Sequence, residues 1–310
     1  SAKGGCCGFC KRRNQAPTFA QTLVVMRHSE RKDQVDPTYK DSVEGKAWPH
    51  DTPLTQRGVK WARKVARELR GLHKQVNFIA IASSPYRRCM ATAAQIAIEF
   101  GLPIVIDQEL GEVWDKAMPS DKLPHRSPSQ LEELAKELGI QVLNPPLPEG
   151  GYKLFGQPPK SWPESLEAGH KRFLVRIENY IQLSADSRQN FIIVGHAPAV
   201  AAMLHIFERG YAEVDSIEYC ARVIARRCVQ QDHVEEHGVF GAKWDVDSKG
   251  MKISMNKPEA HMEKLYENQH LETCEETNEM VASRRANRTN TDMVFDSTLK
   301  DLAATDANAE

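Results

Sequence analysis

The 310-residue chain lacks any apolar run that approaches the ~18 residues needed for a membrane-spanning helix, and its mean hydropathy is −0.52. It also lacks a surplus of one charge, because 41 lysines and arginines face 42 aspartates and glutamates. A dedicated nucleic-acid binder would carry a basic surplus, so we expect no nucleic-acid partner. The start of the chain has no apolar signal core, and the seven cysteines are too irregularly spaced for a disulfide framework. We therefore expect a cytoplasmic protein in a reducing environment.

Three cysteines near the N-terminus, Cys6, Cys7 and Cys10, lie directly before the basic triplet "KRR". They offer three metal ligands at most, and no histidine lies nearby. Acylation of the same cysteines would give peripheral membrane association, with the basic triplet as a second signal. A flexible segment without function explains them as well. The sequence leaves these three interpretations open, and we expect residues 1–20 to be a flexible N-terminal segment.

Strands and helices alternate along the next two hundred residues. Buried strands are predicted at 22–26, 78–84, 104–106 and from residue 190 onward, with a weaker strand at 240–246. Helices are predicted at 54–72, 86–103, 165–183 and 199–207. Thr55 should cap the first of these helices, and Gly101 with Pro103 should end the second. This alternation predicts the α/β class, as a three-layer α/β/α sandwich around a mostly parallel sheet.

Two regions depart from the alternating pattern. Residues 116–165 are rich in proline and glycine around one short helix near 129–138, which we interpret as an insertion over a site rather than another core layer. From Met255 onward the chain has three lysines, three arginines and twelve acidic residues, and periodic apolar patterning fades. We therefore expect residues 256–310 to form an acidic, disordered tail.

Charged and polar side chains follow four of the predicted strands. Arg27, His28 and Arg31 follow the first, Arg87 and Arg88 the second, Glu109, Glu112 and Asp115 the third, and His196 the fourth. Because ligands bind at the carboxyl ends of strands in open α/β sheets, we expect these side chains to meet at one edge. Each residue alone has a purely structural interpretation, such as solvation of a strand end. Their conjunction at four strand ends favours a functional site.

This combination of side chains suits phosphoryl transfer. Planar guanidinium groups donate paired hydrogen bonds to phosphate oxygens. A neutral imidazole, with an ordinary pKa of ~6.5, is a competent nucleophile toward phosphorus. Positive charge stabilises the transition state, and a carboxyl group is needed to protonate the leaving oxygen. No metal or other cofactor is required if the arginines and a second histidine supply the charge.

Five short segments resemble, in this order, the motifs of the histidine phosphatase (phosphoglycerate mutase-like) superfamily: "LVVMRHSER", "DTPLTQRG", "SSPYRRCMATA", "LGE" and "IIVGHAP". The resemblance covers roughly residues 20–255. It implies a histidine phosphatase domain over 21–255, with an insertion at about 116–165 and a phosphoglycerate mutase-like fold.

The resemblance also implies a role for each matching residue. His28 would be the nucleophile that becomes phosphohistidine, and Glu112 the general acid, with Glu109 and Asp115 as alternative acids. The phosphoryl oxygens would be bound by Arg27, Arg31, Arg88 and His196.

One residue departs from the family pattern, because Ser29 stands where glycine is usual. If this position requires a positive φ, serine would be strained there, and the carbonyl that orients the nucleophile could shift. We expect activity to survive, since only a backbone carbonyl is needed. Within the superfamily, "RHSER", "SSP" and "NPPLP" most resemble the UBASH3/STS-type phosphatase branch.

The resemblance implies a phosphatase acting on a small phosphorylated substrate or a phosphotyrosine peptide. A phosphoglycerate mutase-type phosphotransferase is the nearest alternative, and a catalytically weak membrane-tethered adaptor is the alternative from another class. Specificity is predicted to lie in 33–53 and 116–165. The aromatic residues of these segments either line a cleft or pack the insertion onto the core: Tyr39, Trp48, Trp114, Tyr152, Phe155 and Trp162. Related folds often form homodimers, which the sequence leaves open here.

Overall fold

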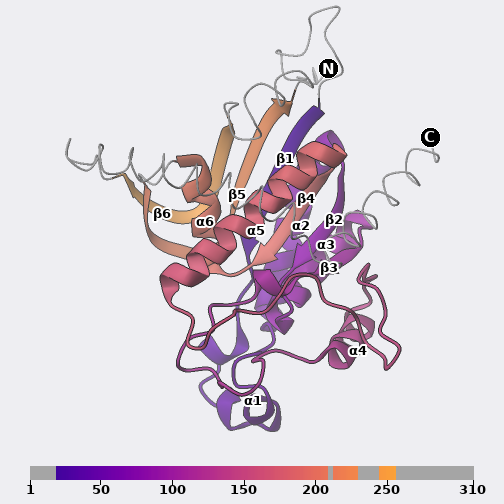
Figure 1. Ribbon diagram of the computed structural model, residues 1–310, viewed down its shortest axis with the longest axis vertical. Helices are drawn as coiled ribbons and strands as arrows, with labels where there is room; N and C mark the ends of the chain where they lie inside the picture. Colours follow the sequence, from indigo (N-terminus) through magenta and orange to yellow (C-terminus); the bar gives the residue numbers. More distant parts are fainter. Residues whose placement is uncertain (1–18, 209–211, 230–243, 256–310) are drawn as a thin grey trace, which may run out of the picture.

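The computed structural model describes residues 19–208, 212–229 and 244–255. A six-stranded mixed sheet in the order β3-β2-β4-β1-β5-β6 lies at its centre (Figure 1). The strands are β1 (Phe19–Arg27), β2 (Phe78–Ser83), β3 (Ile104–Ile106), β4 (Asn190–Gly195), β5 (Ala212–Val229) and β6 (Asp245–Met255). Strands β1 to β4 run parallel, β5 runs antiparallel to β1, and β6 runs antiparallel to β5. The predictions for the N-terminal cysteines and the acidic tail lie outside the described residues.

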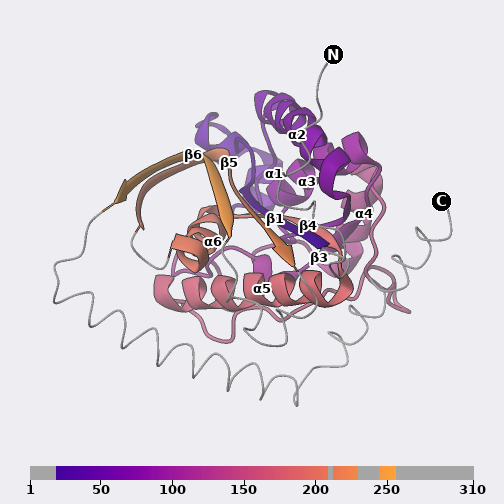
Figure 2. The ribbon, with the colours of Figure 1, turned by 90° about the horizontal axis from the view of Figure 1, so that it is seen from above.

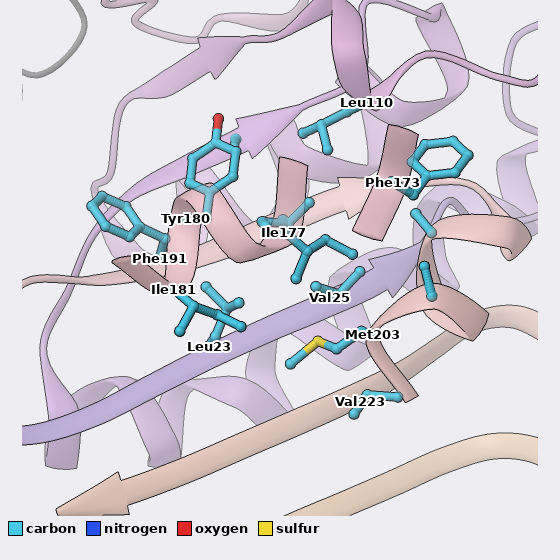
Figure 3. Close-up of a cluster of buried hydrophobic side chains, with 14 of the residues drawn as sticks. Leu23, Val25, Leu110, Phe173, Ile177, Tyr180, Ile181, Phe191, Met203 and Val223 are labelled. Carbon is cyan, nitrogen blue, oxygen red and sulfur yellow. The ribbon is translucent and has the colours of Figure 1, made fainter. Parts of the chain in front are cut away.

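Helices cover both faces of the sheet, as the view from above shows (Figure 2). One face carries α2 (Gln56–Val76), α3 (Arg87–Phe100) and α4 (Pro128–Leu138), and the other carries α5 (Leu166–Ser187) and α6 (Ala197–Glu208). Side chains alternate along β1, because successive residues of a strand point to opposite faces. Leu23 and Val25 pack on the α5 side (Figure 3), whereas Val24 and Met26 pack on the α2–α3 side. The predicted α/β/α sandwich is confirmed.

The predicted helix ends are also confirmed. The Thr55 hydroxyl accepts a hydrogen bond from the Gly58 amide at 2.8 Å and caps α2, while Gly101 ends α3 with a φ of +72°. A short helix α1 (Val43–Ala47) lies in the loop after β1. None of the described helices combines the length and the apolar character needed to cross a bilayer.

The antiparallel part of the sheet was not foreseen correctly. No strand was predicted over β5, whose sequence "AEVDSIEYCARVIARRCV" mixes charged and apolar residues because only part of the strand is buried. The strand predicted at 240–246 overlaps β6 only at Asp245 and Val246, and residues 240–243 lie outside the described part. Continuous apolar runs mark buried parallel strands, and neither β5 nor β6 has one.

The interpretation of residues 116–165 as a cover rather than core is wrong for one face of α4 and for Phe155, whereas most of the segment is exposed or half-buried. Leu131 and Leu134 of α4 are buried in the cluster around α3, and Phe155 is fully buried against α5. Isolated bridges join Val142 to Ile104 and Phe155 to Asp107. The segment therefore extends the core beyond the edge strand β3.

Candidate active site

His28 lies at the carboxyl end of β1, where it is 1% exposed. Its backbone amide donates to the Gly195 carbonyl at 2.9 Å, which continues the β1–β4 pairing. Its ring Nδ1 lies 2.8 Å from the Ser29 carbonyl oxygen. Because a carbonyl only accepts, Nδ1 carries the proton and Nε2 keeps its lone pair.

Ser29 fits its position without strain. The described non-glycine residues with positive φ are Asn77, Arg188 and Cys220, so the position of Ser29 does not require a left-handed conformation. The Ser29 amide donates to the Thr92 hydroxyl at 3.0 Å, and its own hydroxyl donates to the Gly58 carbonyl at 2.8 Å. The carbonyl that orients His28 has not shifted away.

The glycine that follows "LTQR" in the sequence, Gly58, packs closely against the loop after β1. A Cβ at this position would lie 2.6 Å from the Glu30 carbonyl oxygen, so a side chain would push α2 away from the loop after β1. The close approach of these two backbones supports the hydrogen bond from the Ser29 hydroxyl to the Gly58 carbonyl.

Arg88, Glu112 and His196 meet beside His28. Arg88 Nη2 lies 3.2 Å from Glu112 Oε2, and His196 Nδ1 lies 3.0 Å from the same oxygen. The ring centroids of His28 and His196 are 5.5 Å apart. The Ser84 hydroxyl lies 2.9 Å from His196 Nε2, so a neutral His196 donates from Nδ1 to Glu112 and accepts at Nε2 from Ser84.

Burial and the arginines set the protonation of this cluster. Burial, followed by the charge of Arg88 and the proximity of His196, lowers the pKa of His28 well below its usual value. Burial also lowers the pKa of His196 to about 4. For Glu112, burial favours the neutral acid, but His196 and Arg88 outweigh it and hold the pKa of this carboxyl well below its usual value. At neutral pH the site therefore holds two neutral imidazoles and one carboxylate.

Two of the arginines at the end of β1 and the start of α3, Arg27 and Arg88, each keep a buried Nε–H without a partner in the described structure. Arg88 is 1% exposed and donates from Nη1 to the His50 carbonyl at 2.9 Å. Arg27 donates from Nη1 to the Ile217 carbonyl at 2.5 Å. An unsatisfied buried donor is costly, and a bound oxyanion would satisfy both.

The other arginines at the strand ends are already paired. Arg31 donates from Nε to Asp33 at 3.0 Å, and about a quarter of its side chain is exposed. Arg87 forms ion pairs with Glu44 and Glu137. This difference supports Arg88, rather than Arg87, as the arginine of the site.

Among the three carboxylates proposed as acids, Glu112 contacts both Arg88 and His196. Glu109 instead pairs with Arg176 Nη1 at 3.3 Å, and Asp115 accepts from the Ala117 amide in an exposed turn. The geometry therefore favours Glu112.

The cluster of His28, Glu112 and His196 also offers three metal-ligand atoms within 4.8 Å of one another. Arg88 Nη2, however, lies within 3.3 Å of atoms of two of these ligands. A fixed positive charge at this point opposes a cation and suits an anion.

Sequence reasoning missed several residues around the site. Tyr86 lies under the Arg88 guanidinium at 4.4 Å and against the His196 ring at 5.2 Å, and its place in "SSPYRRC" was the available signal. Arg172 of α5 donates to the Glu109 and Gly111 carbonyls at 2.5 and 3.0 Å, which holds the loop that carries Glu112. No sequence pattern links α5 to that loop, because the contact is purely tertiary.

A mostly apolar pocket adjoins Glu112, and the insertion supplies part of its wall. Its lining includes Tyr86, Trp114, Leu123, Pro124, His125 and Pro158. Of the aromatic residues predicted to line a cleft or pack the insertion, Trp114 lines this pocket. Tyr39 and Phe155 are instead buried in the interior. The insertion thus contributes some residues to the hydrophobic core and others to the wall of this pocket.

Comparison with known families adds an independent observation. Residues 23–139 match the model of the histidine phosphatase superfamily, branch 1. These residues belong to that superfamily. No curated protein matches the chain. Membership of the superfamily supports phosphatase or mutase chemistry in general.

The fold of the chain is similar to that of solved structures. Ecdysone phosphate phosphatase from Bombix mori, crystallised with tungstate, has a TM-score of 0.53 at 20% identity. The match covers 77% of this chain and 96% of the phosphatase chain. Phosphoglycerate mutase from Bacillus anthracis has a TM-score of 0.43 at 15% identity, with coverage of 75% and 94%. Mycobacterial glucosyl-3-phosphoglycerate phosphatase has a TM-score of 0.42 at 16% identity, with coverage of 75% and 100%. At these identities the likeness to the first structure concerns the fold alone.

Proposed function

We propose that the protein is a phosphatase that hydrolyses a phosphomonoester through a phosphohistidine on His28. The observation that carries this proposal is the fixed His28 ring. Its Nδ1 is held by the Ser29 carbonyl, and its Nε2 keeps a lone pair beside Arg88, Glu112 and His196.

In the first step, His28 Nε2 attacks phosphorus and the bond to the leaving oxygen breaks. Glu112 gives its proton to that oxygen. In the second step, the Glu112 carboxylate takes a proton from water, and the water oxygen attacks phosphorus. The phosphorus–nitrogen bond then breaks, which releases phosphate and restores His28.

Four residues would bind the phosphoryl oxygens: Arg27, Arg31, Arg88 and His196. Arg27 and Arg88 have unsatisfied Nε–H groups to offer, whereas Arg31 would share its guanidinium with Asp33. We assign Arg31 the outer position, because it is more exposed than Arg88. This set needs no metal or other cofactor.

Substrate binding itself would protonate Glu112. In the ligand-free site the carboxyl is ionised because His196 and Arg88 lower its pKa. A phosphate dianion neutralises Arg88 and adds a negative charge nearby, and both changes raise the pKa of Glu112. The acid is therefore formed when the substrate is in place.

The apolar side chains beside Glu112 would face the leaving group. Contact with Trp114, Leu123 and Pro158 would favour a flat apolar group, such as the ring of a phosphotyrosine peptide or of another small phosphorylated substrate. This preference accords with the UBASH3/STS-type branch, which we retain as part of the proposal.

The test is turnover of para-nitrophenyl phosphate by the purified chain. We expect His28→Ala to lower kcat more than about 1,000-fold, because the nucleophile is lost. His73→Ala is the matched control, since His73 stacks on Phe100 away from these residues. Wild type quenched in alkaline detergent should carry a phosphoryl group that is stable to base and labile to acid, and His28→Ala should lack it.

Two outcomes would contradict the proposal. Isomerisation of 3-phosphoglycerate without release of phosphate would favour a mutase. Equally slow release by wild type and His28→Ala would favour a catalytically weak adaptor.

A further inference from the structure

The middle of β5 contains a bulge next to the candidate active site. The pairing of β5 with β6 shifts register between Ile217 and Arg222. Within this bulge Cys220 has a φ of +56° and is 2% exposed. A buried non-glycine residue in the left-handed region is strained, and such strain persists only where surrounding contacts enforce it.

The surroundings of the bulge do enforce it. Gly250 of β6 packs directly on Ala221, the residue after Cys220 in β5. A Cβ at position 250 would lie 3.1 Å from the Ala221 Cα. On the other side, the Cys220 amide donates to the His28 carbonyl at 3.3 Å. The bulge is thus clamped between β6 and the end of β1, and bulges beside active sites commonly redirect a side chain.

The redirected side chain is Tyr219. Its ring centroid lies 4.5 Å from Arg27 Cζ and 5.9 Å from the centroid of the His28 ring. Trp61 of α2 meets the same ring edge-on at 6.4 Å. Tyr219 is therefore held between α2 and the two residues that end β1.

These contacts fix the Arg27 guanidinium before any ligand binds. The Ile217 carbonyl accepts from Nη1 at 2.5 Å, and the Tyr219 ring covers the face of the group. The Nε–H stays buried without an acceptor. A guanidinium held in this way loses little entropy when it binds an oxyanion.

We propose that Tyr219 is a positioning residue that holds Arg27 for the phosphoryl group, with the strained bulge at Cys220 placing the Tyr219 ring. This inference rests on the proposed function, because it takes Arg27 to be a ligand of the substrate phosphate. The hydroxyl of Tyr219 takes no part in holding Arg27, so the aromatic ring alone should be enough to position the guanidinium.

The test is the affinity of the purified chain for orthovanadate, measured by titration calorimetry. We expect Tyr219→Met to bind about tenfold more weakly, which matches a cation–π contact of about 1.4 kcal/mol. Tyr219→Phe keeps the ring and should stay within about twofold of wild type. Tyr219→Leu is measured beside Tyr219→Met, and thermal unfolding identifies a variant that fails to fold.

A double-mutant cycle distinguishes positioning from a general structural effect. In an Arg27→Met background, Tyr219→Met should weaken binding by less than about twofold, because the group that it positions is already gone. Additive losses, or unchanged binding by Tyr219→Met, would overturn the inference. Absence of vanadate binding by wild type would do the same.

The failure of the proposed function would look different. If His28→Ala and wild type released phosphate equally slowly while the Tyr219–Arg27 coupling persisted, the phosphatase proposal would fail. The positioning of an oxyanion-binding Arg27 would then still hold.

Discussion

The parallel strands β1 to β4 and the antiparallel strand β5 reach the candidate site in different ways. The parallel strands all end at the same edge of the sheet, and the segments that follow them carry His28, Arg88, Glu112 and His196. Strand β5 runs in the opposite direction, so it passes this edge along its length. It contributes through a bulge in mid-strand, with a backbone carbonyl and an aromatic ring. The comparison indicates that the parallel half supplies the reactive groups and the antiparallel half positions one of them.

The largest expected effect belongs to the parallel half. Glu112→Gln removes the proton donor, so kcat should fall about 100- to 10,000-fold for a poor leaving group such as phenol. The loss should be smaller for para-nitrophenol, which leaves without much help. Turnover of phenyl phosphate and para-nitrophenyl phosphate measures the difference. Glu109→Gln and Asp115→Asn test the alternative acids, and a similar loss in either would shift the assignment.

A buried ion pair supports the loop after β3. Asp107 is fully buried and accepts from Arg176 Nε at 2.6 Å and from the Tyr180 hydroxyl at 2.9 Å. Asp107→Asn leaves the buried arginine with the longer ion pair to Glu109, so the free energy of unfolding should fall by about 3 kcal/mol, the low end for a broken buried pair. Urea denaturation measures this value. Glu99→Gln, which breaks a surface pair with Arg70, should cost less than about 1 kcal/mol.

Acid should destabilise the protein through its buried histidines. Burial lowers the pKa of His196 to about 4, whereas an unfolded histidine titrates near ~6.5. Below pH 6.5 His196 therefore binds a proton in the unfolded chain but stays neutral in the folded protein. The free energy of unfolding falls as the pH drops toward 4. From pH 6.5 to pH 5 this amounts to about 1–2 kcal/mol for His196.

Urea unfolding at the two pH values checks this acid dependence. The loss should shrink in His196→Gln, which has no imidazole to protonate. Equal losses in wild type and variant would show that other groups dominate.

Arg172 tests whether the loop that carries Glu112 is held from α5. Its Nε donates to Glu164 at 2.8 Å, and its Nη1 donates to two carbonyls of the loop. Arg172→Lys cannot make these contacts together, so kcat should fall about tenfold while vanadate affinity changes less than about twofold. Arg63→Lys, at an exposed arginine, is the control. A rise in KM with unchanged kcat would count against this account.

The smallest effect is expected in the antiparallel half. Gly250→Ala places a Cβ against Ala221 at a φ of +77°, which should lower the free energy of unfolding by about 1–2 kcal/mol and weaken vanadate binding slightly. In Gly71→Ala the new Cβ meets nothing within 4 Å, and this variant should be stabilised by about 0.5–1 kcal/mol. If Gly250→Ala and Gly71→Ala changed the free energy of unfolding by the same amount, β6 would not hold the bulge in place.

The parallel half could be predicted from sequence because its signals are local. The run "LVVM", the cap at Thr55 and the stop at Gly101 each act within a few residues. The antiparallel half has no such signal, and neither does the placing of Leu131 and Phe155 in the core. The pairing of β5 and the burial of Leu131 and Phe155 depend on contacts with segments far away in the sequence.

The sequence by itself determined the residue types and their order at the strand ends, because a strand that ends in arginine and histidine delivers those groups to the sheet edge. Only the tertiary structure decided which of them face one another. It separated Arg88 from Arg87 and Glu112 from Glu109 through ion pairs with distant residues. It also brought Tyr219, 191 positions after His28, to the side of that residue. Electrostatic and aromatic contacts act over a few ångströms in space, whatever the separation along the chain.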